Sequence, residues 1–101
     1  MGNKINAAIQ VLPQSEGKHA YAIIDEAIGE IRKSGMKYMV CPFESVIEGE
    51  YDKIIALLGK IRDRCYEAGA KEILVNIKLQ MRKNADVAID EKTGKYHKGI
   101  N

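Results

Sequence analysis

The residues best suited to chemistry lie close together between positions 38 and 48. Glu44, Ser45 and Glu48 fall within one short strand-like run, and Tyr38 and Phe43 lie just before it. Carboxylates and a hydroxyl can bind an amino-substituted heterocycle or a cation, and aromatic rings can stack on such a ligand. The alternative is structural, in which the acids face solvent along an ordinary strand. These five residues are therefore the first candidates for a binding site.

Hydrophobic periodicity predicts the elements that must position these residues. Alternating apolar residues favour strands, and apolar residues three and four apart favour helices. Pro13 is expected to end the first strand, and Gly35 is a natural helix stop. The predicted strands span 4–12, 36–41, 44–48 and 71–82, and the predicted helices span 18–33 and 51–68.

The resulting order is β-α-β-β-α-β. Right-handed crossovers then give an α+β, ferredoxin-like sandwich, in which two helices cover one face of a four-stranded antiparallel sheet. Tyr21, Ile24, Ile28 and Ile31 form the expected apolar stripe of the first helix. Each helix also contains a glycine, which is tolerable if the two helices approach each other closely there.

One face of such a sheet lacks helices. We assign Ile5, Ala7, Ile9 and Val11 to the helix side of the first strand. The open face then carries mixed apolar and amide side chains: Asn6, Ala8, Gln10, Leu12, Leu74, Asn76, Lys78 and Gln80. This mixture predicts contact with another subunit rather than with water alone. Asn76 is included among the candidate ligand-binding residues.

Composition excludes several classes of function. A net charge of +2 over 101 residues is too small to indicate a nucleic-acid partner. No apolar run approaches the roughly 18 residues that span a bilayer, so no membrane partner is expected. Cys41 and Cys65 are far apart and show no metal-ligand spacing. We expect reduced thiols, a cytoplasmic protein, and neither metal nor cofactor.

Catalytic motifs are also missing from the sequence. No phosphate-binding glycine loop, nucleophile elbow or zinc-hydrolase motif occurs, and the predicted central strands lack the aromatic residues of an RNA-recognition module. An enzyme would have to depend on Cys41, which no histidine or cationic cluster adjoins in sequence. We therefore predict a protein without catalytic residues.

Several segments resemble the thiamine-binding (YkoF-like) family of small ferredoxin-like proteins. Members typically show a helix-ending SGLKY, a P-x-x-T-x-[IV]-E-G strand, and a later AGA-K strand that ends in an I-K pair. This chain has SGMKY at 34–38, PFESVIEG at 42–49, AGAK at 68–71 and IK at 77–78. The resemblance extends from residue 4 to about residue 82.

The resemblance implies a non-enzymatic binder of thiamine or its hydroxymethylpyrimidine moiety, assembled as a dimer or tetramer. The family's threonine falls at Ser45 and its glutamate at Glu48, which is followed by Gly49. The carboxylate can accept a hydrogen bond from the exocyclic amine of the pyrimidine, and the hydroxyl can donate or accept. Gly49 has a structural explanation as well, because glycine permits a turn into the second helix.

The sequence therefore predicts one domain over residues 1–82 and a C-terminal tail over residues 83–101. The tail is compatible with a short strand followed by a helix capped by Asp90. The predicted function is binding of a thiamine-related ligand at a pocket near a subunit interface. The alternative is a structural or regulatory module that assembles without a small-molecule ligand.

Overall fold

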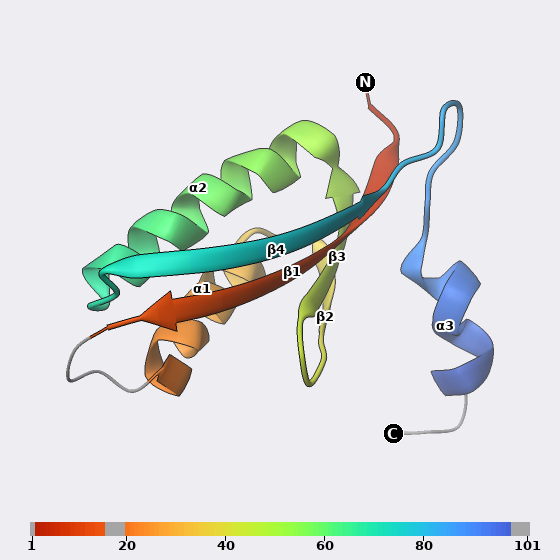
Figure 1. Cartoon of the computed structure of the whole chain (residues 1–101). Helices are drawn as coiled ribbons and strands as arrows, with labels where there is room; N and C mark the ends of the chain where they lie inside the picture. Colours follow the sequence, from red (N-terminus) through yellow and green to blue (C-terminus); the bar gives the residue numbers. More distant parts are fainter. Residues whose placement is uncertain (1, 16–19, 98–101) are drawn as a thin grey trace.

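Four strands form one antiparallel sheet in the computed structural model of the protein, which describes residues 2–15 and 20–97 (Figure 1). The strands lie in the order β2-β3-β1-β4, so β3 and β1 are central. Two long helices pack on one face, which confirms the predicted ferredoxin-like arrangement. In chain order the elements are β1 (Lys4–Gln14), α1 (Ala20–Lys33), β2 (Lys37–Val40), β3 (Ser45–Glu50), α2 (Tyr51–Glu67), β4 (Glu72–Gln80) and α3 (Ile89–His97).

The two faces of the sheet follow the predicted alternation of β1. Ala7 lies opposite Ile47 of β3 and Leu79 of β4, and all three face the helices. Its neighbour Ala8 lies opposite Val46 and therefore on the other face. The assignment of the helix side is confirmed, because Ile5, Ala7 and Ile9 are buried and Val11 packs against the same core.

The helices contribute one apolar stripe each to this core. In α1 the buried residues are Ile23, Ala27 and Ile31, so the stripe is rotated from the predicted one, and Tyr21 is 72% exposed. In α2 they are Ile54, Leu57, Ile61 and Cys65. Full burial of each isoleucine stabilises the fold by about 1.5–3 kcal/mol relative to exposure. The predicted start of α1 at residue 18 lies outside the described residues.

The predicted reason for the helical glycines is wrong. A Cβ built on Gly29 would meet no described atom within 4 Å, and one built on Gly59 would meet only the Arg62 guanidinium, at 3.9 Å. The two helices do pack side by side (Figure 1), but not through these glycines. Gly49 is also not a turn residue, since it lies inside β3 and has no positive φ. The Met36 side chain packs directly over it, so a Cβ at this position would force that side chain to shift.

Two strand boundaries differ from the predicted ones for local reasons. β1 continues through Pro13 to Gln14, because beyond Ile9 its residues pair only with β4. One side of Pro13 has no neighbouring strand, so its missing N–H need not break a pair of hydrogen-bonded strands. β3 begins at Ser45 and runs to Glu50, directly into α2.

The tail packs on the sheet face opposite to α1 and α2 (Figure 1). The tail contains the helix α3 at Ile89–His97, and residues 83–88 form no strand. Val87 and Ile89 are buried against this face, and the Val87 N–H donates to the Lys4 carbonyl at 2.9 Å. Asp90 lies within the helix rather than before it, so it is not the predicted cap.

Glycine substitutions separate these packing roles. We expect Gly49→Ala to lower the free energy of unfolding by about 1–3 kcal/mol, because the Met36 side chain must leave its position. We expect Gly59→Ala to raise it by up to about 1 kcal/mol, since alanine favours a helix and has room there. Urea unfolding of both variants checks this. Equal changes in both variants would contradict the assigned role of Met36.

Candidate functional site

The alternation of β3 separates the two residues that the sequence placed at the centre of one site. Ser45 pairs with Ile9 and is buried on the helix side of the sheet. Glu48 pairs with Asn6 and faces the opposite side. Positions three apart in a strand always point to opposite faces. Within one chain, Ser45 and Glu48 therefore do not line the same pocket.

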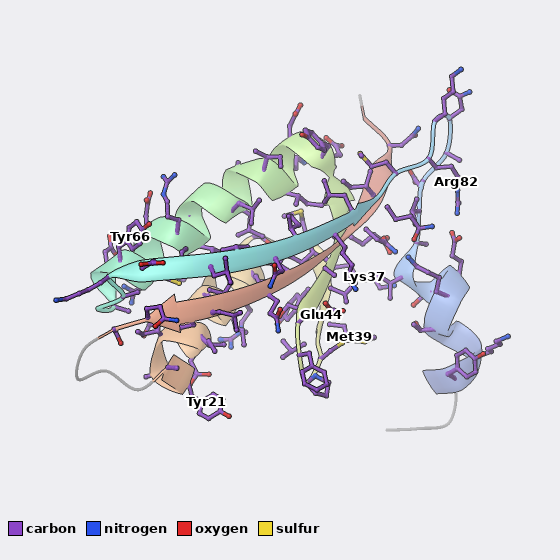
Figure 2. All side chains as sticks on the ribbon, in the orientation of Figure 1. Tyr21, Lys37, Met39, Glu44, Tyr66 and Arg82 are labelled. Carbon is purple, nitrogen blue, oxygen red and sulfur yellow. The ribbon has the colours of Figure 1, made fainter. Side chains whose placement is uncertain are left out.

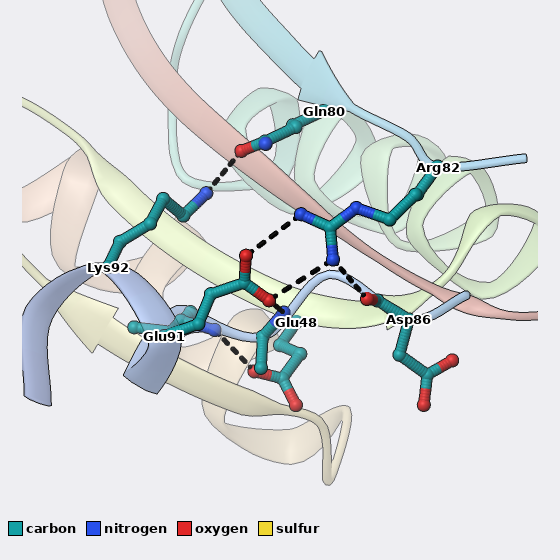
Figure 3. A network of polar contacts seen from close by, with 8 residues as sticks. Glu48, Gln80, Arg82, Asp86, Glu91 and Lys92 are labelled. Atoms are coloured by element: carbon teal, nitrogen blue, oxygen red, sulfur yellow. Dashed lines mark hydrogen bonds and ion pairs between the residues drawn. The ribbon is translucent and has the colours of Figure 1, made fainter.

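Glu48 holds the start of α3. Its Oε1 accepts a hydrogen bond from the Ile89 N–H at 2.8 Å (Figure 3). The first N–H groups of a helix have no partner within the helix, and a carboxylate there is favoured by the helix dipole. Beside it, the Lys37 ammonium donates to the Asp90 carboxylate at 2.8 Å, and this hydrogen bond raises the pKa of Lys37.

A second set of contacts joins the tail to Arg82, which immediately precedes it. Arg82 forms two hydrogen bonds with Glu91, at 2.8 and 3.3 Å, and also donates to the Asp86 carbonyl at 2.9 Å (Figure 3). The Glu91 carboxylate also accepts from the Ala88 N–H at 3.2 Å. The Arg82 hydrogen bonds, followed by the one from Ala88, lower the pKa of Glu91 from its usual 4.5 to about 2.

Ser45 lines a hollow of about 350 Å³ between α1, β1 and the turn that joins β2 to β3. We call it the acidic hollow, because its charged lining residues are Asp25 and Glu44. The Ser45 side chain forms no hydrogen bond with any other residue that the structure describes. Because no buried side-chain polar atom of the described residues lacks a partner, this hydroxyl is accessible at the surface of the hollow. Asp25 is likewise in no ion pair with the described residues.

Aromatic side chains border the acidic hollow. Phe43 lies in the β2–β3 turn and is 80% exposed, and Tyr21 projects from the first turn of α1 (Figure 2). Such exposed rings are suited to stacking on a flat heterocycle. Carboxylates, a hydroxyl and aromatic rings together can bind an amino-substituted aromatic cation.

A larger hollow of about 750 Å³ lies on the other side of the sheet, between the open face and α3. We call it the basic hollow, because its charged lining residues are Lys78 and Lys92. The turn residues Val40, Cys41 and Pro42 line both hollows, so the β2–β3 hairpin separates them. The two hollows therefore offer opposite charge on opposite sides of one hairpin.

The structure thus brings together three of the six predicted ligand-binding residues: Phe43, Glu44 and Ser45. Tyr38 lies on β2, opposite Ile47 of β3, and it lines neither hollow. Asn76 donates to the Gln10 side chain at 3.1 Å on the open face. Glu48 is engaged by α3, as described above.

Sequence reasoning missed Tyr21 and Asp25. Tyr21 belongs to the predicted buried stripe of its helix, and no sequence pattern gives Asp25 a role. Their spacing indicates that both project from the same face of α1, because residues four apart share one face of a helix. The spacing alone does not place the two residues at the site, because the sequence does not show which face of α1 borders the β2–β3 turn.

The described residues contain neither a membrane-spanning helix nor a metal-binding cluster. No described helix is long and apolar enough to cross a membrane. No group of three or more histidine, cysteine or acidic side chains in residues 2–15 and 20–97 is arranged to hold a metal ion. Cys65 is buried in the core, which raises the pKa of its thiol, and Cys41 is half-buried; both are free.

Fold and site define a ferredoxin-like α+β protein with a cleft suited to a small heterocycle. The chain belongs to the thiamine-binding protein family, whose sequence pattern matches residues 7–97. The match includes α3, so the tail lies within the region that the family shares. The predicted family is therefore confirmed.

Individual relatives agree with this assignment. A UPF0045 protein of Clostridium perfringens is 34% identical over 91 residues, which cover 90% of this chain and 95% of the relative. A domain of unknown function from Bacillus cereus superposes with a TM-score of 0.89 at 34% identity, over 93% of this chain and 90% of that one. A Thermotoga maritima protein, assigned provisionally to thiamine biosynthesis or salvage, gives 0.83 at 29% identity, over 92% and 98%.

The anchoring role of Glu48 is directly testable. We expect Glu48→Ala to speed hydrogen exchange of the Ile89 amide at least tenfold, because this amide loses its acceptor and α3 loosens. Glu50→Ala is the matched control, since Glu50 is an acidic residue of the same strand and its side chain forms no hydrogen bond with α3 among the described residues. Unchanged exchange at Ile89 in Glu48→Ala would contradict the role.

The Arg82–Glu91 contact predicts a dependence on pH. A carboxylate with a depressed pKa stabilises the folded arrangement above its unfolded pKa, and this contribution is lost as the pH falls through the folded value. Docking of the segment from Ala88 to Glu91 should therefore weaken between about pH 4.5 and pH 2. NMR shifts of the Ala88 amide should report this change, and Glu91→Gln should abolish it. A persistent shift in Glu91→Gln would assign the transition to another group.

Proposed function

We propose that this protein binds thiamine or its hydroxymethylpyrimidine moiety in the acidic hollow and does not turn it over. The supporting observation is the Ser45 hydroxyl, which lines the hollow on a largely buried residue and forms no hydrogen bond with the described residues. Since no buried side-chain polar atom of the described residues lacks a partner, this hydroxyl is accessible from the hollow, where a ligand can donate to it or accept from it. The family membership supports the same ligand class.

Charge favours the acidic hollow over the basic one for this ligand. Thiamine carries a positive thiazolium ring, which Asp25 and Glu44 would attract and which Lys78 and Lys92 would repel. The exocyclic amine of the pyrimidine can donate to either carboxylate, and Ser45 can bind a ring nitrogen. Glu48 is already bonded to α3, and the Glu44 carboxylate lies 4.0 Å from the Lys78 ammonium. We therefore assign the main carboxylate role in this pocket to Asp25, with Glu44 as a second acceptor.

Size and aromatic groups are compatible with this assignment. The hollow of about 350 Å³ lies within the usual range for small-molecule sites, near its lower end. A pyrimidine could rest against Phe43 or Tyr21, whose rings are largely exposed in the single chain. We propose that a second copy covers part of this surface in a dimer or tetramer, which places the pocket near a subunit interface. The two free cysteines favour a reducing, cytoplasmic setting.

Calorimetric titration with thiamine and with hydroxymethylpyrimidine tests the proposal. We expect binding of at least one of them, weakened about tenfold or more by Ser45→Ala and by Asp25→Asn. Glu48→Gln is the matched control on the other face of β3, and it should change the affinity less than threefold. NMR of the ligand after prolonged incubation should show it chemically unchanged.

Absence of heat with either ligand, at protein well above micromolar concentration, would refute the proposal. It would favour the second candidate, an assembly module without a ligand. One observation supports that candidate independently: Leu12 and Leu74 are paired across β1 and β4, on the face without α1 and α2, and are 38% and 57% exposed. Such a pair is suited to contact with another subunit.

A further inference from the structure

The basic hollow is a second cleft, to which the proposed function assigns no ligand. Its floor is the open face of the sheet, where Ala8, Val46 and Met39 lie side by side in register across three strands. One wall is α3, through Ile89 and Thr93. The hollow of about 750 Å³ is large enough for a drug-sized organic molecule. It is lined mainly by apolar side chains.

The Lys92 ammonium forms no ion pair with the described residues, although its charge helps to lower the pKa of the neighbouring Glu91 carboxyl. The ammonium donates to the Gln80 side-chain oxygen (Figure 3). With the Asn6 amide turned so that its oxygen and nitrogen exchange places, the ammonium also donates to the Asn6 oxygen at 2.8 Å. This orientation satisfies both groups of the amide, because its nitrogen then donates to the Val87 carbonyl at 2.8 Å. Both acceptors of the ammonium are neutral amides. Since an ammonium has three donors, one N–H remains for a further acceptor.

Lys78 adds a second cation on the same face. Its ammonium is 4.0 Å from the Glu44 carboxylate, at the limit of an ion pair, and its side chain is 80% exposed. No carboxylate occurs among the residues that line this hollow. The Gln80 amide nitrogen is a further donor without a partner among the described residues. The polar groups of the hollow are therefore dominated by donors and positive charge.

We propose that the basic hollow is a second binding site, which takes a small amphipathic organic anion. The apolar body of the ligand rests on Ala8, Val46 and Met39, and its oxyanion head accepts hydrogen bonds from Lys92 and Lys78. This ligand differs from the one proposed for the acidic hollow in the sign of its charge. The two sites lie on opposite sides of the β2–β3 hairpin, so the second proposal does not depend on the first.

Fluorescence of 8-anilinonaphthalene-1-sulfonate, an amphipathic aromatic sulfonate, tests the site on the full chain. We expect saturable binding of one dye molecule per chain, weakened about tenfold or more by Lys92→Met and several-fold by Lys78→Met. Lys95→Met is the matched control, because Lys95 is on the same helix and lies instead over the Tyr96 ring. Lys92→Arg retains the charge and should keep the affinity within threefold.

Two further arms identify the head group and the role of charge. Octanoate and octyl phosphate should displace the dye, and the stronger competitor shows whether a carboxylate or a phosphate is preferred. The neutral dye N-phenyl-1-naphthylamine should bind the wild type and Lys92→Met equally, because it has no anionic head. Near-UV circular dichroism confirms that each variant is folded, since this anionic dye also binds partly unfolded proteins.

Several results would overturn the proposal. They are no dye binding to the folded chain, equal weakening by Lys92→Met and Lys95→Met, or displacement by neither competitor. Dye binding that appears only on dilution to monomers would also overturn it, because a second copy would then occupy this face in the assembled protein.

Discussion

Alternation of side chains along β3 determines the chemistry on each side of the sheet. Because β3 is central and paired on both sides, its register is fixed, and a shift of one residue would expose Ile47 and bury Glu48. Ser45 is thereby committed to the side of α1 and α2, and Glu48 to the side of α3. The acidic and basic hollows follow from this division.

The tail completes the second side of the sheet. Without residues 83–97 the face opposite to α1 and α2 would be bare, with mixed apolar and amide side chains. Val87 and Ile89 bury apolar surface there, while Glu48 satisfies the first N–H of α3. The exposed ion pair between Lys37 and Asp90 contributes little stability. Most of the free energy that holds the tail on the sheet therefore comes from the buried apolar side chains and this hydrogen bond. The helix then encloses space that the sheet alone would leave open.

Much of the fold could be predicted from the sequence, because periodicity depends on local geometry. The element order, the helix side of β1 and the open set of β4 all follow from alternation within one strand. The position of α3 could not be predicted in this way, since it depends on a contact between Glu48 and Ile89, which are 41 positions apart. The reason for Gly49 was missed similarly, because it requires knowing where the Met36 side chain packs.

The candidate site was predicted only in part, and the physical reason is again the strand period. Residues close in sequence were grouped as one site, although adjacent strand positions point apart. Phe43, Glu44 and Ser45 stay together because they lie in or next to the turn. Tyr21 and Asp25 join them from α1 through tertiary packing, which the sequence does not encode in any local pattern.

The most direct test of the account is an NMR titration of the labelled full chain with thiamine. If the ligand binds on the helix side of the sheet, the amide shifts should change most at 21–25 and 43–45 and little at 78–80 and 89–93. Changes concentrated at 78–80 and 89–93 instead would contradict the central claim, because they would place the cation in the hollow that contains the two lysines.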